Sequence, residues 1–102
     1  MAQFDIHRNP KRGTFPLLLD VQADLLSSLA TRVVVPMTKV DRRSAKPISR
    51  LNPTALVEGV TYALVFQELA AIPKAALGER VGSLAGRRVE LIAALDLLLT
   101  GI

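Results

Sequence analysis

Residues 54–65 read Thr-Ala-Leu-Val-Glu-Gly-Val-Thr-Tyr-Ala-Leu-Val, and this stretch decides the fold. Two runs of β-prone residues, 54–57 and 60–65, flank the dipeptide Glu58-Gly59. A two-residue connection that ends in glycine favours a tight hairpin turn, because glycine adopts a positive φ at little steric cost. The stretch therefore predicts two antiparallel strands joined by a turn.

Short β-prone segments also lie on both sides of this hairpin. They are residues 3–7, 15–19, 32–35 and 69–72. We expect the third to end at Pro36 and the fourth at Pro73, because proline cannot donate to a strand ladder. Residues 38–47 are charged and lack an apolar period, so we interpret them as a long loop. No crossover helix separates the strands, which predicts an antiparallel sheet.

The C-terminal part of the chain has a different pattern. Ser83 is suited to cap a helix, and residues 87–99 contain good helix formers without Gly or Pro. Over residues 91–99 apolar side chains point to nearly all sides of such a helix. One face must then pack on the sheet and another on a second copy or a partner. The sequence predicts a single domain over residues 1–102, mainly β with a C-terminal α-helix.

Composition narrows the class of protein. The chain has 102 residues, half of them apolar, and a mean hydropathy of +0.34, which favours an oligomer in so small a protein. The absence of cysteine excludes a disulfide scaffold, a thiolate zinc site and a cysteine nucleophile. The first residues resemble no signal peptide, and the apolar run 91–95 is far shorter than the roughly 20 residues that span a bilayer. We expect a cytoplasmic protein with no membrane contact.

The net charge of +4 raises the question of an acidic partner. Most basic residues fall in two clusters, Arg8, Lys11 and Arg12, then Lys39, Arg42, Arg43, Lys46 and Arg50. The few aromatic residues are not interleaved with these clusters as base stacking requires. The clusters are interpreted either as solvated loops or as an attraction for an acidic protein.

Residues suited to catalysis are scarce. His7 is the only histidine and is expected to be a surface residue of an edge strand. No His or carboxylate ligands cluster in the sequence, so we expect no metal, no cofactor and no catalytic residue, and hence no enzyme. Gly78, Gly82 and Gly86 lack the Gly-Lys-Ser/Thr end of a P-loop and are interpreted as turn and helix-boundary glycines.

Two aspartates follow the strand at residues 15–19. Asp20 and Asp24 are expected to hydrogen-bond their own backbone, with partner binding as the alternative. The next two residues, Leu25 and Leu26, are either core plugs or an exposed anchor for a partner.

Four short motifs occur in a collinear order, Asp20-Val21-Gln22-Ala23-Asp24, Arg32-Val33-Val34-Val35-Pro36, Ile72-Pro73 and the terminal Gly101-Ile102. Together with the chain length they resemble the CcdB family, the toxin half of a type II toxin–antitoxin pair. The resemblance covers the whole chain. It implies an SH3-like barrel-type antiparallel sheet followed by a C-terminal helix, assembled as a homodimer.

The resemblance also implies a function. CcdB toxins bind the A subunit of DNA gyrase and trap the cleaved-DNA complex, and so act as topoisomerase poisons. A cognate antitoxin, acidic and partly disordered, folds on the toxin and neutralises it. The pair regulates transcription of its own operon, so the toxin meets that DNA only indirectly, through the antitoxin complex.

The family's target-binding surface falls on two segments of this sequence. Carried over residue by residue, it comprises Ala23, Leu25, Leu26, Asp96, Leu99, Thr100, Gly101 and Ile102. The family pattern places a tryptophan directly before the terminal Gly-Ile, where this chain has Thr100. One alternative is therefore a non-toxic member that retains only antitoxin binding and operon regulation. Another is a ribonuclease toxin on a similar fold, with Arg8, Asp20 and Arg32 as the candidate groups.

Overall fold

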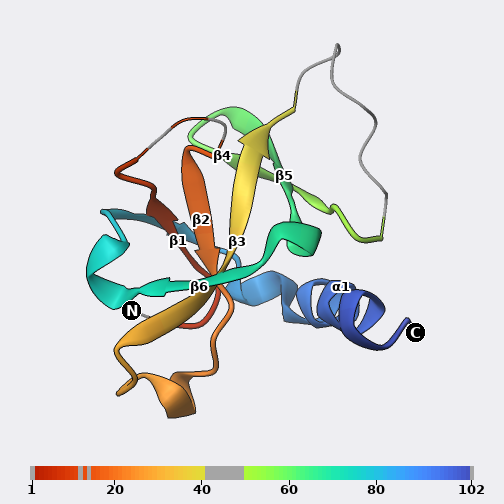
Figure 1. Ribbon diagram of the computed structural model, residues 1–102. Coiled ribbons are helices and arrows are strands. Elements are labelled where there is room, and N and C mark those ends of the chain that lie inside the picture. Colours follow the sequence, from red (N-terminus) through yellow and green to blue (C-terminus); the bar gives the residue numbers. More distant parts are fainter. Residues whose placement is uncertain (1, 12, 14, 41–49, 102) are drawn as a thin grey trace.

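The computed structural model describes residues 2–11, 13, 15–40 and 50–101 of the chain. Within these residues, strands form one curled antiparallel sheet and one α-helix lies against it near the C-terminus (Figure 1). The elements are β1 (Asp5–Arg8), β2 (Leu17–Asp20), β3 (Thr31–Lys39), β4 (Thr54–Val57), β5 (Val60–Leu64), β6 (Ala70–Pro73), β7 (Arg80–Ser83) and α1 (Arg88–Thr100). The predicted fold class, a mainly β SH3-like barrel-type sheet with a C-terminal helix, is confirmed.

The hairpin that opened the sequence argument is present as expected. β4 pairs with β5 in antiparallel register, with Val57 opposite Val60. Both turn residues have positive φ, 50° at Glu58 and 79° at Gly59, which is the conformation of a tight type I′ turn. The local twist of this turn matches the twist of the strands, so the register is fixed by the turn itself.

The strand order is β4-β5-β3-β2-β1-β7, with β6 paired to β3 outside this path. β3 does not end at Pro36 as predicted but continues to Lys39. It pairs with β6 through residues 31–34 and with β5 through residues 37–39, so Pro36 lies at the gap between these two partners. In an antiparallel ladder alternate residues face alternate sides. The missing N–H of Pro36 faces that gap and removes no ladder bond, and its carbonyl accepts from the backbone N–H of Val65.

β7 was missed by the sequence reasoning. It pairs with β1, with Asp5 opposite Ser83, and β1 is therefore an inner strand instead of an edge. His7 is consequently buried, at 4% exposure, and the prediction of a surface histidine was wrong.

Of the three spaced glycines, Gly82 lies inside β7, so its assignment to a turn was wrong. Gly78 allows the chain to pass close to β1, since a Cβ at this position would lie 2.6 Å from the Arg8 carbonyl oxygen.

Short 3₁₀ turns connect the strands, η1 (Asp24–Leu26), η2 (Phe66–Glu68), η3 (Lys74–Ala76) and η4 (Ala85–Arg87). Ser83 belongs to β7, and its Oγ accepts from the backbone N–H of Ala85, so it does not cap α1 as predicted. The helix follows η4 directly, with no side-chain capping bond at its start.

The core lies between the curled sheet and α1. Its fully or nearly fully buried side chains include Phe4, Ile6, Leu19, Val35, Met37, Leu64, Phe66, Leu91 and Ala94. Leu91 and Ala94 are the buried residues of α1, and the helix also contacts η2. The predicted loop 38–47 lies largely outside the described residues, and its first two residues belong to β3. None of the described helices is both long and apolar enough to cross a membrane.

Candidate partner-binding site

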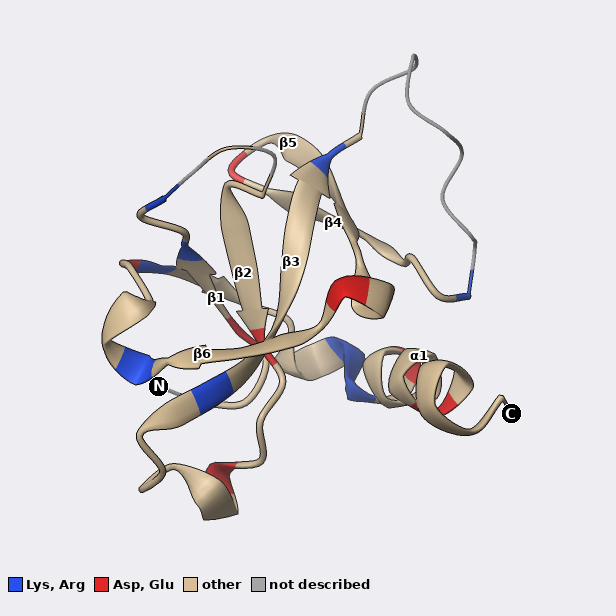
Figure 2. Cartoon of the chain, in the orientation of Figure 1, with Lys and Arg blue, Asp and Glu red and all other residues tan. Residues whose placement is uncertain are grey.

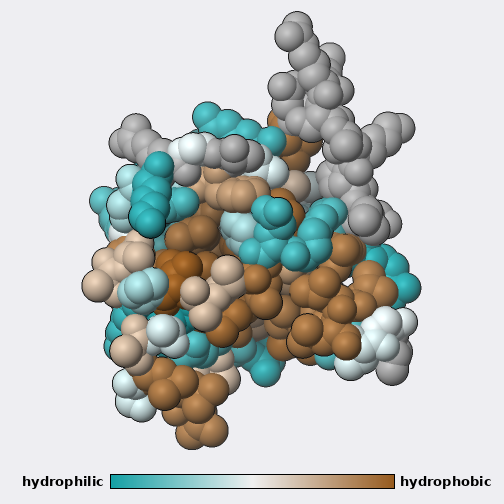
Figure 3. Space-filling view, in the orientation of Figure 1, coloured by the Kyte–Doolittle hydropathy of each residue, from teal (hydrophilic) through white to brown (hydrophobic). Residues whose placement is uncertain are grey.

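The loop after β2 displays three large apolar side chains to solvent. Leu25 is 91% exposed, Leu26 46% and Leu29 47%. Of the two interpretations of Leu25 and Leu26, the core plug is therefore wrong, and an exposed anchor fits the structure. We call residues 23–29 the leucine loop, and Figure 3 shows it as an apolar protrusion at the lower left of the molecule. Ala23, the first residue of the predicted target surface, is exposed there too.

The carboxylate of Asp20 forms hydrogen bonds at the base of this loop. It is fully buried, and Oδ1 accepts from the backbone N–H of Gln22 at 3.0 Å, as the capping prediction required. Its Oδ2 accepts from Nε and Nη2 of Arg32 at 2.9 and 2.6 Å. The Arg32 side chain is also 0% exposed. A buried carboxylate and a buried guanidinium thus neutralise each other where the loop leaves the sheet.

Two further polar side chains complete the loop. Asp24 Oδ1 accepts from the backbone N–H of Gln3 at 2.7 Å. Gln22, buried at 6% exposure, donates from Nε2 to the carbonyl of Leu26 at 3.0 Å, and its Oε1 accepts from the backbone N–H of Val33. The sequence reasoning identified Asp20 and Asp24, considered Arg32 only for ribonuclease chemistry, and missed Gln3 and Gln22 as parts of the site. A polar Gln between the two aspartates was the local signal that could have drawn attention to Gln22.

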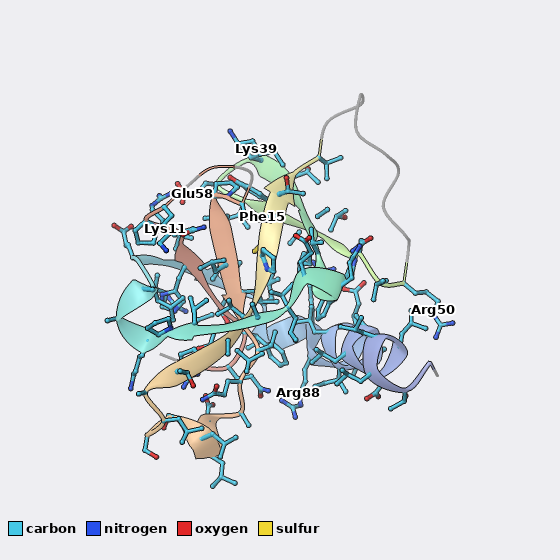
Figure 4. All side chains as sticks on the ribbon, in the orientation of Figure 1. Lys11, Phe15, Lys39, Arg50, Glu58 and Arg88 are labelled. Carbon is cyan, nitrogen blue, oxygen red and sulfur yellow. The ribbon has the colours of Figure 1, made fainter. Side chains whose placement is uncertain are left out.

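The N-terminal turn links the leucine loop to α1. Arg88 leaves the first turn of the helix (Figure 4), lies 5.8 Å from the centre of the Phe4 ring, and donates from Nη1 to Gln3 Oε1 at 2.7 Å. Phe4 has a φ of 69°, a left-handed conformation that costs a non-glycine residue about 1–2 kcal/mol. Burial of its ring and two backbone bonds, to Asp20 and from Leu84, hold it there.

The second predicted segment lies at the end of α1. Asp96, Leu99 and Thr100 are exposed, with Leu99 at 71%. Thr100 donates from Oγ1 to the carbonyl of Asp96 at 2.7 Å. Gly101 adopts a left-handed conformation, with a φ of 76°, and donates its N–H to Leu97, which ends the helix. Ile102 lies outside the described residues.

The two segments of the predicted target surface are not adjacent in one chain. Figure 1 shows η1, which carries Leu25 and Leu26, well separated from the C-terminal end of α1. The structure therefore presents two separate exposed patches, one on a loop and one on a helix end, and does not unite them into one surface.

Figure 2 shows where the basic and acidic residues lie along the chain, and several of the basic side chains form ion pairs with carboxylates. Arg8 contacts Glu58 at 2.9 Å and Glu79 at 3.9 Å, and Arg80 contacts Asp5 at 3.1 Å. Arg12, Arg42, Arg43 and Lys46 lie outside the described residues.

The three residues considered for ribonuclease chemistry do not form an accessible set. Asp20 and Arg32 contact each other but are shielded from solvent, whereas Arg8 is half-exposed and bonded to Glu58. His7 is buried, and its Nδ1 lies 3.0 Å from the carbonyl of Gly78. In the part of the chain that the structure describes, no three His, Asp or Glu side chains come together as a metal ion requires.

Comparison with known proteins gives the context for these patches. The family model described as CcdB protein matches residues 3–101 of the chain. Among solved structures, the Mycobacterium tuberculosis toxin MazF-mt6 is 17% identical, with 92% of this chain and 94% of that chain covered and a TM-score of 0.72. An endoribonuclease from Mycobacterial species is 16% identical, with 97% and 90% covered and a TM-score of 0.72.

A third solved structure is an endoribonuclease in complex with its cognate antitoxin, also from Mycobacterial species. It is 18% identical, covers 97% of this chain and 94% of its own, and has a TM-score of 0.67. At these identities the likeness to the three structures is one of fold.

Proposed function

This chain belongs to the CcdB family of toxin–antitoxin toxins, and from that premise we propose that it binds the A subunit of DNA gyrase and traps the cleaved-DNA complex. It acts by binding, as a topoisomerase poison, and uses no catalytic residue of its own. A cognate antitoxin neutralises it and joins it in regulating transcription of their operon.

The observation that supports this function best is the leucine loop. Leu25 and Leu26 are exposed at positions where the resemblance implies contact with the target. Burying a leucine side chain is worth about 1.5–3 kcal/mol, so a partner that covers the nearly fully exposed Leu25 gains this free energy on binding. The exposed helix end, with Leu99, Thr100 and Gly101, supplies the second contact.

A homodimer accounts for the outer side of α1. Val89 is 86% exposed and Leu99 71%. Ile92 and Leu95 pack against the core but are only partly buried. A second copy packed on this side removes that apolar area from water. Two copies also bring a second leucine loop and a second helix end into one assembly, so that a partner can touch both kinds of patch.

The antitoxin is expected to be acidic and partly disordered before it binds. A net charge of +4 on the toxin attracts such a chain over distances of about 8–10 Å in physiological salt. A similar fold is found in an endoribonuclease solved with its cognate antitoxin, which supports a bound antitoxin on this fold. The toxin meets operon DNA only through the antitoxin complex.

An endoribonuclease is the second candidate, since two solved structures of similar fold are endoribonucleases. The buried Asp20–Arg32 pair speaks against it, because neither group can reach a bound RNA without unfolding the loop. The third candidate, antitoxin binding and operon regulation without toxicity, is motivated by Thr100 in place of the family tryptophan.

One experiment separates the three candidates. The chain is expressed from an inducible promoter, and RNA integrity and gyrase-dependent DNA cleavage are measured in the same cells. Accumulation of cleaved DNA with intact RNA is the expected result, and it should disappear in Leu25→Ser. Degraded RNA with intact DNA would establish the endoribonuclease, and growth without either lesion would leave the regulatory candidate.

A further inference from the structure

We infer that Gln22 is a positioning residue, which holds the leucine loop in the conformation that a partner binds. The inference rests on the proposed function for the identity of the partner, but the fixed loop conformation is a property of the free chain. Gln22 does not need to touch the partner, because its side chain is buried beneath the loop at 6% exposure.

The first support is the way the β2–β3 ladder ends. Asp20 lies opposite Val34, and the backbone N–H of Val21 still donates to the carbonyl of Val33 at 3.0 Å. In a regular antiparallel ladder Val33 would return a hydrogen bond to the carbonyl of Val21. Instead, the N–H of Val33 donates to Gln22 Oε1 at 3.1 Å, and the carbonyl of Val21 accepts from Gln3 Nε2 at 3.2 Å. Two glutamine side chains thus replace one of the two backbone hydrogen bonds between Val21 and Val33.

The second support is the hydrogen bond that the Gln22 side-chain nitrogen donates to the loop. Gln22 Nε2 donates to the carbonyl of Leu26 at 3.0 Å, so one side chain ties the end of η1 to the middle of β3. Closing this gap takes an acceptor and a donor on the same side chain, and the amide of Gln22 supplies both. Gln22 therefore clamps the loop across its base.

The third support is the lack of packing in the loop itself. None of the η1 residues, Asp24 to Leu26, is buried, so apolar contacts cannot fix their conformation. Hydrogen bonds hold the loop instead. Gln22 and the carboxylate of Asp24, which accepts from Gln3, bond its base, Lys74 Nζ donates to the carbonyl of Ser27 at 3.1 Å, and the N–H groups of Ser27 and Leu29 donate to the carbonyls of Asp24 and Leu26. A loop held in this way keeps Leu25 and Leu26 exposed and ordered at the same time.

The clamp affects affinity through the population of the binding-competent conformation. The apparent dissociation constant is the intrinsic one divided by the fraction of molecules in that conformation. If release of the clamp leaves the loop competent in about one molecule in ten, binding weakens about tenfold without the loss of any contact with the partner.

Three matched variants test this inference. Gln22→Met keeps the length of the side chain and removes both hydrogen bonds. Leu25→Ser removes a contact residue and leaves the clamp. Gln67→Met is the control, because Gln67 also makes side-chain hydrogen bonds, to Asn52, but belongs to η2. Amide hydrogen exchange of Ser27 and Leu29 in the free chain and affinity for the gyrase A subunit are measured for each.

We expect Gln22→Met to speed exchange at Ser27 and Leu29 about tenfold, with Val35 in the sheet unchanged, and to weaken gyrase binding by a similar factor. Leu25→Ser should weaken binding with normal exchange, and Gln67→Met should change neither. Unchanged loop exchange in Gln22→Met overturns the inference. The inference is also overturned if Gln67→Met weakens gyrase binding as much as Gln22→Met does. If the wild type does not bind gyrase A, the proposed function fails, and the exchange measurement still decides whether Gln22 is a clamp.

Discussion

Replacing Asp20 with asparagine should remove a large part of the folding free energy, because it leaves the buried guanidinium of Arg32 without a counter-charge. Both side chains are 0% exposed, and Oδ2 of Asp20 lies 2.6 and 2.9 Å from two guanidinium nitrogens. Loss of one partner from a buried ion pair typically costs about 3–5 kcal/mol. The total free energy of unfolding of a typical domain is only about 5–15 kcal/mol. Asparagine keeps an oxygen that can accept from the Gln22 N–H, so the change isolates the charge.

Urea unfolding followed by circular dichroism measures this cost. Glu58→Gln is the control, because it breaks the exposed ion pair with Arg8 and should change the free energy of unfolding by less than about 1 kcal/mol. The double change Asp20→Leu with Arg32→Met should recover much of the loss, since apolar replacement of both partners of a buried pair is often neutral. If Asp20→Asn unfolds within about 1 kcal/mol of the wild type, the pair is not the strong interaction that its burial indicates.

Further outcomes are expected for variants of α1 and its C-terminal end, for the close packing of Gly78 on Arg8, and for antitoxin binding. Leu99→Arg should give a monomer of nearly unchanged stability in sedimentation, because Leu99 is 71% exposed in the chain; a stable dimer in this variant would contradict the use of that side of α1. Thr100→Trp should tighten gyrase binding, since an interface tryptophan is typically worth about 2–4 kcal/mol, or on the order of 30- to 1,000-fold in affinity; calorimetry that finds weaker binding refutes the transfer of that anchor. Gly78→Ala should destabilise the chain by about 1–3 kcal/mol, since its Cβ would meet backbone; thermal melting checks this, and an unchanged Tm speaks against it. Antitoxin association should slow as salt rises from roughly 50 to 300 mM, and a salt-independent stopped-flow rate would argue against electrostatic steering.

Local signals predicted the fold well where the decisive interactions are local. The Glu58-Gly59 turn fixed the hairpin, and the run of helix formers after residue 87 gave α1 within a residue of its true start. β7 escaped detection because Arg80–Ser83 has one apolar residue and a glycine, and becomes a strand only through its pairing with β1. The burial of His7 follows from that same distant pairing.

In the candidate site, too, local interactions could be predicted from the sequence and long-range ones could not. Asp20 was expected to bond its own backbone, and its Oδ1 accepts from Gln22 two residues later. Its ion pair with Arg32 depends on the register of β2 against β3, which no local pattern specifies. The clamp by Gln22 joins the end of η1 to β3 and is likewise visible only in three dimensions.

The pairing of β1 with β7 also sets the order in which a newly made chain can fold. Asp5 is synthesised long before its partner Ser83, which follows it in the sequence by about 80 residues. At about 5–20 residues per second, several seconds pass in which one side of β1 has no strand to pair with. The residues of α1, which cover the core with Leu91, follow later still. The sheet therefore closes only after β7 has been synthesised, and nascent chains that lack β7 expose apolar surface that chaperones recognise.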